Sequence, residues 1–408
     1  MSKSIFLEKL LDKAEVKWVP LGELTKIKSG QAVNKTMIAE NPGDYPVINS
    51  GREPLGYIDQ WNTENDPIGI TSRGAGVGSI TWREGRYYRG NLNYSVSIED
   101  GANVRTKFLL HLLLYMQREI QDLCTYDGIP ALNASNLKQL LLPIPCPENP
   151  EKSLAIQAEI VRILDTFTEL TAELTAELTA RKKQYNYYRD QLLTFEDGEV
   201  AWKPLGQVIS NLRTGLNPRK NFKLNPQGAT NSYVTVRELG GFDLVISEKT
   251  DRVNNEGLAL IQRRSKLQAG DVLFSATGTI GRTALIAEQP KDWNIKEGVY
   301  AITPVPALLN SRFLIYLLQS TKIRRKFLAS ADGSVVASVS MASFRKLEIP
   351  VPALAEQARI VAILDKFDTL THSISEGLPR EIELRQNQYE HYRDLLLNFP
   401  KKQTEGVA

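Results

Sequence analysis

QAEIVRILDTF, at Gln157–Phe167, returns as QARIVAILDKF at Gln357–Phe367, with eight of eleven positions identical. A second string, QYNYYRDQLLTF at Gln184–Phe195, returns as QYEHYRDLLLNF at Gln388–Phe399, with eight of twelve positions identical. Self-similarity at a fixed separation is typical of duplicated architectures. The chain is therefore predicted to hold two copies of one scaffold, which would present two comparable binding surfaces.

A third pair of strings opens each copy. EVKWVPLG at Glu15–Gly22 returns as EVAWKPLG at Glu199–Gly206. Between the repeated strings the two copies diverge, and weaker matches align SRGAGVG (Ser72–Gly78) with SATGTIG (Ser275–Gly281) and Ile144-Pro-Cys-Pro147 with Ile349-Pro-Val-Pro352. The second copy carries about 19 extra residues before its glycine-rich turn, within roughly 210–270. We expect one fold to be kept in both copies while its surface differs.

Composition limits the class of protein. At 408 residues, 24% charged and 42% hydrophobic, the chain is long enough for two to four compact units. Two cysteines and three histidines argue against a disulfide framework and against a Cys/His zinc site. No apolar run reaches the length of a membrane span, and the first residues lack a signal-peptide pattern. We expect a cytoplasmic protein.

The charge distribution is uneven between the copies. Residues 13–145 hold 14 basic and 14 acidic residues, whereas residues 199–352 hold 21 basic and 12 acidic ones, a net charge of +9. A basic domain between acidic helical segments suggests a polyanionic partner. Solvated surface charge is an equally good explanation of this pattern taken alone.

The divergent segments have the pattern of mixed α+β domains. Short runs rich in Val, Ile, Tyr and Thr, bounded by Gly, Asn and Pro, predict strands. The predicted strands include Tyr45–Asn49, Ile68–Thr71, Ser232–Val236 and Asp271–Ser275. Apolar stripes at helical spacing predict helices at Thr106–Leu123 and Asn310–Leu328.

The repeated segments predict long helices. Over Leu154–Phe195 apolar residues recur at the sevenfold spacing of a coiled coil. The second copy follows the same pattern until Gly377-Leu378-Pro379, where we expect a break or kink. Neither helix can bury its apolar stripe alone, so the simplest arrangement packs the two against each other. The stripe comprises Ile160, Leu164, Phe167, Leu174, Leu178, Tyr185, Tyr188, Ile360, Leu364, Phe367, Tyr389 and Tyr392.

The chain begins with a fragment that resembles the end of its own long helix. LEKLLD at Leu7–Asp12 precedes the first opening string, as DQLLT at Asp190–Thr194 precedes the second. This similarity predicts a circular arrangement with a pseudo-two-fold axis and adjacent termini. A chance helical fragment would give the same pattern.

Catalytic motifs are missing from the sequence. Gly74-Ala-Gly76-Val-Gly78 lacks the third glycine and the following helix of a dinucleotide-binding loop, so it predicts a tight β-turn. The three histidines, His111, His372 and His391, all fall in helical patterns and are expected to be packing or surface residues. No serine-hydrolase, metalloprotease, kinase or zinc pattern occurs.

Basic residues interleaved with aromatics and amides remain as candidate functional residues. Arginine and asparagine can read base edges in DNA, and lysine and arginine neutralise phosphates. The candidate DNA-binding residues are Ser72, Arg73, Gly74, Arg83, Arg86, Tyr88, Arg89, Asn91, Asn93, Arg213, Arg219, Lys220, Arg237, Arg263, Arg264, Lys266, Ser275, Thr277 and Arg282. Each stretch taken singly could be ordinary surface, and its occurrence in both copies strengthens the DNA interpretation.

The repeated strings resemble the specificity subunit of type I restriction–modification systems. The similarity rests on EIVRILDTF and RIVAILDKF, on YYRDQLL and HYRDLLL, on the EVxWxPLG strings and on the IPxP segments, and it covers nearly the whole chain. TELTAELTAELTAR at Thr168–Arg181 is similar to the IC subfamily, in which TAEL units repeat in the spacer helix.

This resemblance implies a domain plan. It comprises an N-terminal helical stub at 1–12, a target-recognition domain at 13–150, a spacer helix at 151–198, a second recognition domain at 199–352 and a C-terminal spacer helix at 353–408. The implied fold is α+β, with two recognition domains separated by an antiparallel coiled coil. The two spacers are unequal, because 16 residues separate Phe167 from Gln184 and 20 separate Phe367 from Gln388.

The resemblance also implies the function. Each recognition domain would read one half of a bipartite DNA site, and the chain itself would have no catalytic activity, no cofactor and no metal. The apolar stripe of the repeated helices would serve spacing and subunit docking. Two methyltransferase subunits would dock on these helices and bind S-adenosylmethionine, motor-nuclease subunits would bind ATP and Mg²⁺, and the complex would associate with the bacterial nucleoid. Two alternatives stay open: a self-contained methyltransferase or nuclease, and a coiled-coil scaffold with two protein-binding domains.

Overall fold

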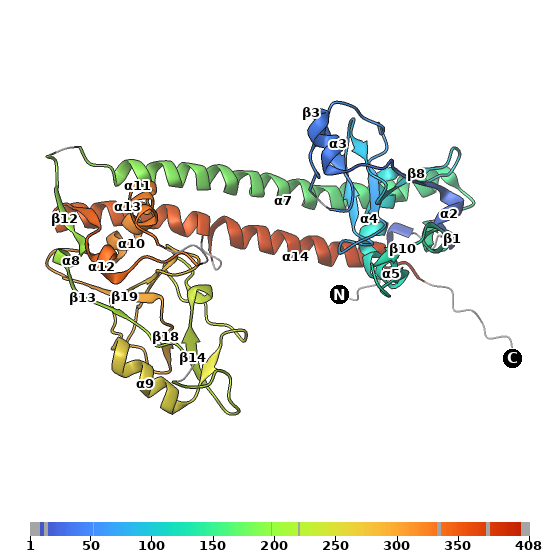
Figure 1. Cartoon of the computed structure of the whole chain (residues 1–408). Coiled ribbons are helices and arrows are strands. Elements are labelled where there is room, and N and C mark those ends of the chain that lie inside the picture. Colours follow the sequence, from blue (N-terminus) through green and yellow to red (C-terminus); the bar gives the residue numbers. More distant parts are fainter. Residues whose placement is uncertain are drawn as a thin grey trace. The chain divides into compact units, whose positions relative to one another are not determined.

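The protein folds into two compact units. The computed structural model describes residues 9–11, 15–51, 53–196, 198–218, 221–332, 336–372 and 376–400. The first unit comprises Met1–Leu174 and Glu381–Ala408, and the second comprises Thr175–Arg380. Each unit therefore combines one divergent domain with segments of two repeated helices (Figure 1).

The first unit contains a mixed α+β domain followed by the long helix α7. Its elements are β1 (Val16–Pro20), α2 (Leu21–Leu24), β2 (Thr25–Ser29), α3 (Lys35–Glu40), β3 (Pro42–Ile48), β4 (Tyr57–Ile58), β5 (Ile68–Thr71), β6 (Ile80–Trp82), β7 (Tyr88–Arg89), β8 (Asn93–Ile98), α4 (Thr106–Tyr115), α5 (Gln117–Asp122), β9 (Cys124–Thr125), β10 (Ala131–Leu132), α6 (Ala134–Lys138), β11 (Leu141–Pro145) and α7 (Pro150–Leu192).

The second unit repeats this order with additions. Its elements are β12 (Ala201–Pro204), α8 (Leu205–Val208), β13 (Ile209–Thr214), β14 (Asn231–Val234), the 3₁₀ helix η1 (Val236–Glu238), β15 (Arg252–Val253), α9 (Asn255–Ser265), β16 (Val272–Ser275), β17 (Thr283–Leu285), β18 (Trp293–Ile295), β19 (Val299–Pro304), α10 (Ser311–Gln319), α11 (Thr321–Ala329), α12 (Met341–Arg345), β20 (Glu348–Val351), α13 (Leu354–His372) and α14 (Gly377–Leu397).

The two domains share one sheet topology. A four-stranded antiparallel sheet has the order β2-β8-β5-β6 in the first unit and β13-β19-β16-β17 in the second. A three-stranded sheet pairs β3 with β7 in parallel in the first unit, and β14 with β18 in parallel in the second. The prediction of mixed α+β domains is confirmed, and β5 has the predicted bounds.

The predicted helices in the domains each divide in two. α4 and α5 replace the single helix expected at Thr106–Leu123, and α10 and α11 replace the one expected at Asn310–Leu328. Ser320, between α10 and α11, has an extended backbone with ψ of 147°, and its hydroxyl donates to the Leu317 carbonyl. The apolar stripe continues across the junction, which is why the sequence pattern did not reveal it.

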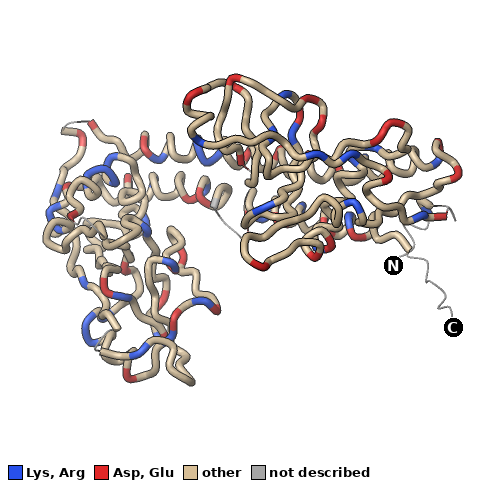
Figure 2. Tube along the Cα trace, turned by 45° about the vertical axis from the view of Figure 1, so that its right-hand side comes forward, with Lys and Arg blue, Asp and Glu red and all other residues tan. Residues whose placement is uncertain are grey.

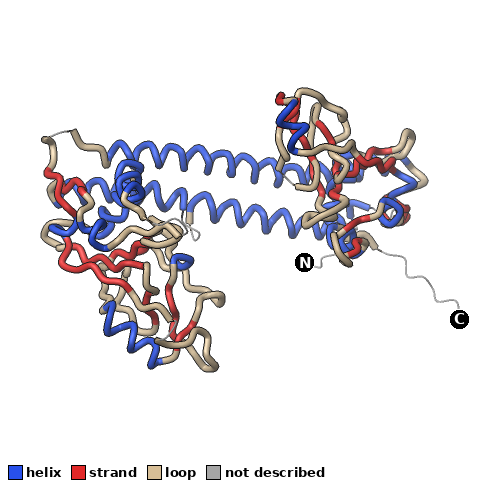
Figure 3. The backbone as a smooth tube through the Cα atoms, viewed as in Figure 1, coloured by secondary structure: helices blue, strands red, loops and turns tan. Residues whose placement is uncertain are grey.

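The repeated segments form long helices, which are blue in Figure 3. α7 is one helix of 43 residues, and the C-terminal segment forms α13 and α14 as separate helices. α13 ends at His372 and α14 begins at Gly377, whose φ is +76°. The predicted interruption at Gly377-Leu378-Pro379 is therefore present, and it lies at the start of α14.

A two-stranded antiparallel ladder joins the first and last strands of each domain. The registers of the two ladders show which residues of the two copies correspond. β1 pairs with β11 so that Trp18 lies opposite Pro143, and β12 pairs with β20 so that Trp202 lies opposite Pro350. Pro143 therefore corresponds to Pro350, a shift of 207. The expected match of Ile144-Pro-Cys-Pro147 with Ile349-Pro-Val-Pro352 is wrong by two residues, because alternating prolines look alike in either register.

The extra residues of the second copy lie in two connections. Between β14 and β15 there are 17 residues, against 8 between β3 and β4. Between β15 and β16 there are 18, including α9, against 9 between β4 and β5. The expected location of the extra residues is confirmed, and part of them form the helix α9, which has no counterpart between β4 and β5.

Each domain shares a hydrophobic core with its repeated helices. In the first unit, Phe108 and Leu112 of α4 lie in one cluster with Ile160 of α7 and Leu397 of α14. Leu11 belongs to the same cluster. Of the predicted stub at Leu7–Asp12, residues 9–11 are helical and the others lie outside the described residues. Among the described residues no helix is long and apolar enough to cross a membrane.

Candidate nucleic-acid interface

A glycine-rich turn leads out of the central sheet at the same place in both domains. It joins β5 to β6 in the first domain and β16 to β17 in the second, which confirms the predicted β-turn. Gly74 and Gly278 have φ of +92° and +76°, a conformation that glycine adopts without strain. A Cβ added at either glycine would meet no atom within 4 Å, so this side of the turn is open.

Backbone hydrogen bonds define which residues of the two turns correspond. Thr71 N donates to Ser79 O, and Ser275 N donates to Arg282 O, both over 2.8–2.9 Å. Thr71 therefore corresponds to Ser275, and the expected match of Ser72 with Ser275 is wrong by one residue. The second turn is one residue shorter, which an alignment of matching letters cannot detect.

A second loop is held against each turn. In the first domain Gly74 N donates to Pro130 O at 2.9 Å, and Leu132 N donates to Ser72 O at 2.9 Å. In the second domain Gly278 N donates to Ala337 O at 3.0 Å, and Val339 N donates to Ala276 O at 2.9 Å. In each domain the turn and the loop thus form a backbone frame, and this frame has the same hydrogen bonds in both domains. We call it the shared frame.

Several of the expected DNA-binding residues of the first domain are exposed. Arg73, Arg83, Arg86 and Asn91 are exposed, and Gly74 is half-buried. The Arg86 guanidinium pairs with Glu64 at 2.8 Å and lies 4.7 Å from the centroid of the Trp61 ring. Arg73, on the glycine turn itself, is the exposed cation that lies on the shared frame.

The other expected residues of the first domain lie in the interior: Ser72, Tyr88, Arg89 and Asn93 are all buried. The Arg89 guanidinium donates to the carbonyls of Ile68, Asp66 and Tyr94 and to Asn93 Oδ1. Because its donors satisfy carbonyls within the domain, Arg89 is a structural residue. Arg89 thus lies in the interior, whereas the sequence analysis expected it on the DNA-binding surface.

Exposed residues predominate among the candidates of the second domain: Arg237, Arg263, Arg264, Lys266, Thr277 and Arg282 are exposed, and Ser275 is buried. Arg219 and Lys220 lie outside the described residues. Thr277 lies on the glycine turn at the position that corresponds to Arg73. Basic and acidic residues are interspersed along both units (Figure 2).

Arg213 is a second candidate whose guanidinium is held within its domain, and its side chain is 11% exposed. Its guanidinium lies 2.6 Å from Asp271 Oδ2 and donates to Thr303 Oγ1 at 2.7 Å. Burial raises the pKa of the Asp271 carboxyl, although the hydrogen bond from Thr303 and the charge of Arg213 act in the opposite direction. In this structure Arg213 is thus held in an ion pair with the buried Asp271, within the domain, whereas the sequence analysis expected it on the DNA-binding surface.

The helical stripe divides into core and half-exposed residues. Ile160, Leu164, Tyr185, Ile360, Leu364 and Tyr389 are buried, Phe167, Leu174, Leu178 and Phe367 are half-buried, and Tyr188 and Tyr392 are exposed. The buried members pack within their own unit, where Ile160 and Ile360 belong to the two main cores. These buried side chains are not accessible to another subunit. The predicted stripe did not distinguish residues that pack internally from residues on the surface.

A repeated aspartate attaches each domain to its helix. Asp165 of α7 lies 2.8 Å from His111 Nε2 and 3.6 Å from Lys107 Nζ. Asp365 of α13 accepts from Tyr316 OH at 2.6 Å and from Arg312 at 2.8 Å. In both units one carboxylate thus holds a cation and a ring donor four residues apart on the domain helix.

A repeated glutamine makes a second attachment. Gln157 Oε1 accepts from Arg105 N at 2.8 Å, and its Nε2 donates to Asn103 O at 2.9 Å. Gln357 does the same with Asn310 N and Leu308 O, at 2.8 and 2.9 Å. The sequence analysis missed these residues as functional, although the glutamine and the aspartate are identical in both copies of the string that ends at Phe167 and Phe367.

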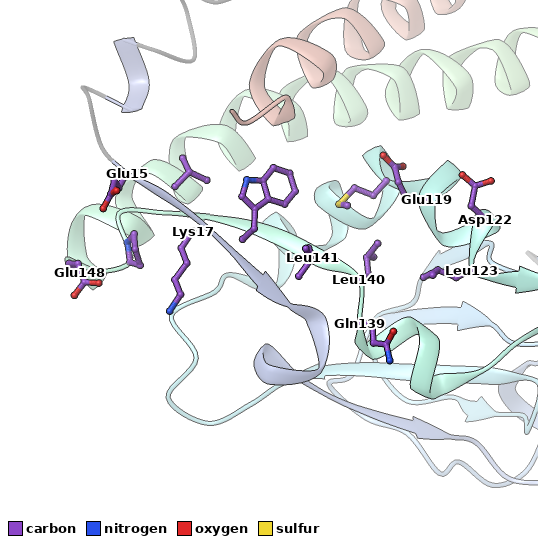
Figure 4. Close-up of a pocket in the computed structure, with 13 residues that line it drawn as sticks. Glu15, Lys17, Glu119, Asp122, Leu123, Gln139, Leu140, Leu141 and Glu148 are labelled. Carbon is purple, nitrogen blue, oxygen red and sulfur yellow. The ribbon is translucent and has the colours of Figure 1, made fainter. Parts of the chain in front are cut away.

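The first domain also has an open groove of about 820 Å³. Trp18, Met116, Leu123, Leu140 and Leu141 are among its apolar lining residues. Acidic residues line it as well, and they are labelled together with Leu123, Leu140 and Leu141 in Figure 4. The acidic lining residues are Glu15, Glu119, Asp122 and Glu148. In the second domain the Nζ atoms of Lys322 and Lys326 lie 4.8 and 4.3 Å from the Trp202 ring, so the corresponding tryptophan is covered. The two domains therefore differ chemically at this surface.

Comparisons with known proteins agree with this geometry. The family model described as "Type I restriction modification DNA specificity domain" matches residues 13–181 and 201–384. The EcoR124I/EcoR124II specificity subunit of Escherichia coli is 38% identical, with 99% of each chain covered. The EcoprrI specificity subunit of the same species is 29% identical, covering 92% of this chain and 93% of its own.

The fold is also that of solved specificity subunits. The crystal structure of a type I restriction–modification S subunit from M. genitalium has a TM-score of 0.58 at 18% identity, covering 96% of this chain and 98% of its own. The duplicated domains, the shared frame and the matches over both copies lead to one conclusion. The chain belongs to the type I restriction–modification DNA specificity family, and it is a non-catalytic DNA-recognition subunit.

Proposed function

We propose that each domain reads one half of a bipartite DNA site through its turn-and-loop frame. The supporting observation is that the frame is the same in both domains while its exposed side chains differ, as Arg73 and Thr277 do. A common backbone with different side chains suits a common docking geometry on DNA with different base contacts. Exposed cations, such as Arg282 at the end of the second turn and Arg83 at the far end of the β5–β6 hairpin, would contact phosphates.

The repeated helices would set the distance between the two half-sites. In this proposal α7 and the C-terminal helices pack as an antiparallel coiled coil in a circular, pseudo-two-fold arrangement, and the TAEL units of Thr168–Arg181 act as a ruler of the IC type. The matching attachments at Asp165 and Asp365 support it, because they fix each domain to its helix in the same way.

The chemistry would be supplied by partner subunits. Two methyltransferase subunits would dock on the repeated helices, bind S-adenosylmethionine and flip the target adenines out of the duplex. Motor-nuclease subunits with ATP and Mg²⁺ would carry out restriction, in the cytoplasm at the nucleoid. Within the described residues no group of three or more His, Cys, Asp or Glu side chains could hold a metal ion.

Adenine-methylation mapping tests the proposal. Cells expressing this chain with its cognate methyltransferase are expected to carry methyl groups in one split motif, with one adenine modified in each half. A matched variant replaces Trp202–Gln357 by a copy of Trp18–Gln157, and it is expected to give a palindromic site. A complex without any sequence preference would favour a protein-binding scaffold, and methylation by the isolated chain would favour a self-contained methyltransferase.

A further inference from the structure

Both domains hold one exposed aliphatic side chain on the loop of the shared frame. Ile129 is 76% exposed, more than any other large hydrophobic residue in the described part of the chain, and Val336 is 55% exposed. The residue after each of them accepts the hydrogen bond from the turn glycine, Pro130 from Gly74 and Ala337 from Gly278. Ile129 and Val336 therefore occupy the same position in the two domains.

Ile129 and Val336 are both aliphatic, although the residues around them differ between the two domains. The neighbouring turn residues are Arg73 in one domain and Thr277 in the other. An exposed aliphatic side chain is thus present at the same position of two surfaces that otherwise differ. We therefore expect it to act in a step of DNA modification that is the same at both half-sites. Sequence reading cannot be that step, because the two domains differ in the side chains that would read bases.

The loop presents this side chain in a fixed position. In the first domain the loop is held by Gly74 N to Pro130 O, by Leu132 N to Ser72 O and by the pairing of β9 with β10. Gly128, next to Ile129, has φ of +92°, and an added Cβ there would meet no atom within 4 Å. A rigid, open loop loses little conformational entropy when its side chain enters a partner.

We propose that Ile129 and Val336 are wedges that enter the duplex beside the target adenine of each half-site. The inference rests on the proposed function and extends it to the flipping step. An apolar side chain between base steps partly unstacks them, and a base must leave the stack before it can be methylated. Contact with a protein subunit is less favoured, because such an interface buries a broad patch, whereas among the described loop residues Ile129 and Val336 are the pair of large exposed aliphatic side chains at corresponding positions.

The test uses the chain assembled with its methyltransferase subunits. Flipping is read from duplexes in which 2-aminopurine, which brightens when it is unstacked, replaces the target adenine of one half-site, and methylation is read from duplexes that keep both target adenines. Ile129→Ala is expected to reduce the fluorescence change and the methylation rate about tenfold at one half-site only, and Val336→Ala at the other. Leu55→Ala and Val245→Ala, which also truncate exposed residues of the two domains, serve as controls and should change neither value.

A second readout separates a wedge from a structural role. An abasic position opposite the target adenine removes its pairing and lowers the cost of flipping, so this duplex should restore methylation by Ile129→Ala. Unchanged flipping in both variants, equal loss at both half-sites, or lost binding of the methyltransferase without DNA would each overturn the proposal. A wild-type complex without site preference would instead refute the proposed function.

Discussion

The ring of Phe167 in α7 stacks on the ring of Tyr392 in α14, with centroids 5.0 Å apart and planes 18° apart. Phe367 of α13 and Tyr188 of α7 make the same pair in the second unit, at 5.7 Å and 27°. The two phenylalanines end the two copies of the first repeated string, and the two tyrosines lie in the copies of the second. One aromatic contact thus holds a pair of helices together in each unit.

Truncation of this pair should weaken one unit at a time. Tyr392→Ala removes a stack worth about 1 kcal/mol beyond its buried area, and it should reduce hydrogen-exchange protection in the first part of α7. Tyr188→Ala should reduce protection in α13 instead. The control Tyr126→Ala, 60% exposed in the first domain, should change neither helix. Equal loss in both units after one substitution would contradict this assignment.

The attachment at His111 should make the first unit sensitive to acid. Burial lowers the pKa of His111 below its ordinary value near 6.5, although Asp165 acts in the opposite direction. The unfolded chain then binds the proton more readily, so this contribution to stability is present above pH ~6.5 and is lost as the pH falls through the folded-state pKa. Urea unfolding at several pH values from about 7.5 down to about 5 measures this change in the free energy of unfolding.

His111→Tyr supplies the matched comparison, because the second unit has Tyr316 at this position, bonded to Asp365. The variant should lose the part of the pH dependence that arises from His111 while it keeps the bond to Asp165. The same slope of stability against pH in both proteins would show that His111 does not titrate in this range.

Interior and surface arginines should respond differently to substitution. Arg89→Met leaves buried carbonyls, including Asp66 O and Tyr94 O, without their donor and should lower the free energy of unfolding by about 3 kcal/mol. Arg73→Met should leave stability unchanged and weaken DNA binding, with a smaller dependence of affinity on salt. Thermal unfolding and DNA titration at two salt concentrations distinguish the two roles, and the reverse pattern would contradict the placement of Arg89.

Changing the number of TAEL units tests the ruler. One added unit lengthens a helix by about 6 Å and turns it by about 40°, whereas one base pair corresponds to about 3.4 Å. The gap between half-sites is expected to grow by one or two base pairs while the half-sites stay the same. Methylation mapping of the variants gives the gap directly, and an altered half-site would disprove the ruler.

The contact between Trp18 and Pro400 makes a circular permutation testable. The Trp18 indole N–H donates to Pro400 O at 3.1 Å, so the last described residue lies beside the first strand. A chain with its natural ends joined by a short Gly–Ser linker, and opened between Gly198 and Glu199, should keep its site and its gap. Opening the chain within α10 is the control, because it cuts a core helix and should prevent folding. Loss of sequence preference in the first permutant would exclude a circular arrangement.

Much of the fold could be predicted from the repeat, because identical core residues such as Ile160 and Ile360 serve the same packing in each unit. The register could not be predicted, since matching serines or prolines do not reveal which N–H meets which carbonyl. The role of Arg89 was hidden for a similar reason. Its partners are main-chain carbonyls of distant residues, and a carbonyl belongs to every residue type.

The composition of the first unit has a consequence for synthesis on the ribosome. Its core includes Leu396, Leu397 and Phe399, which are among the last described residues to be made. The second unit, Thr175–Arg380, is continuous in sequence and can fold as it emerges. The second unit can therefore fold before the first is complete, because the core around Phe108 closes only after the C-terminal helix has been made.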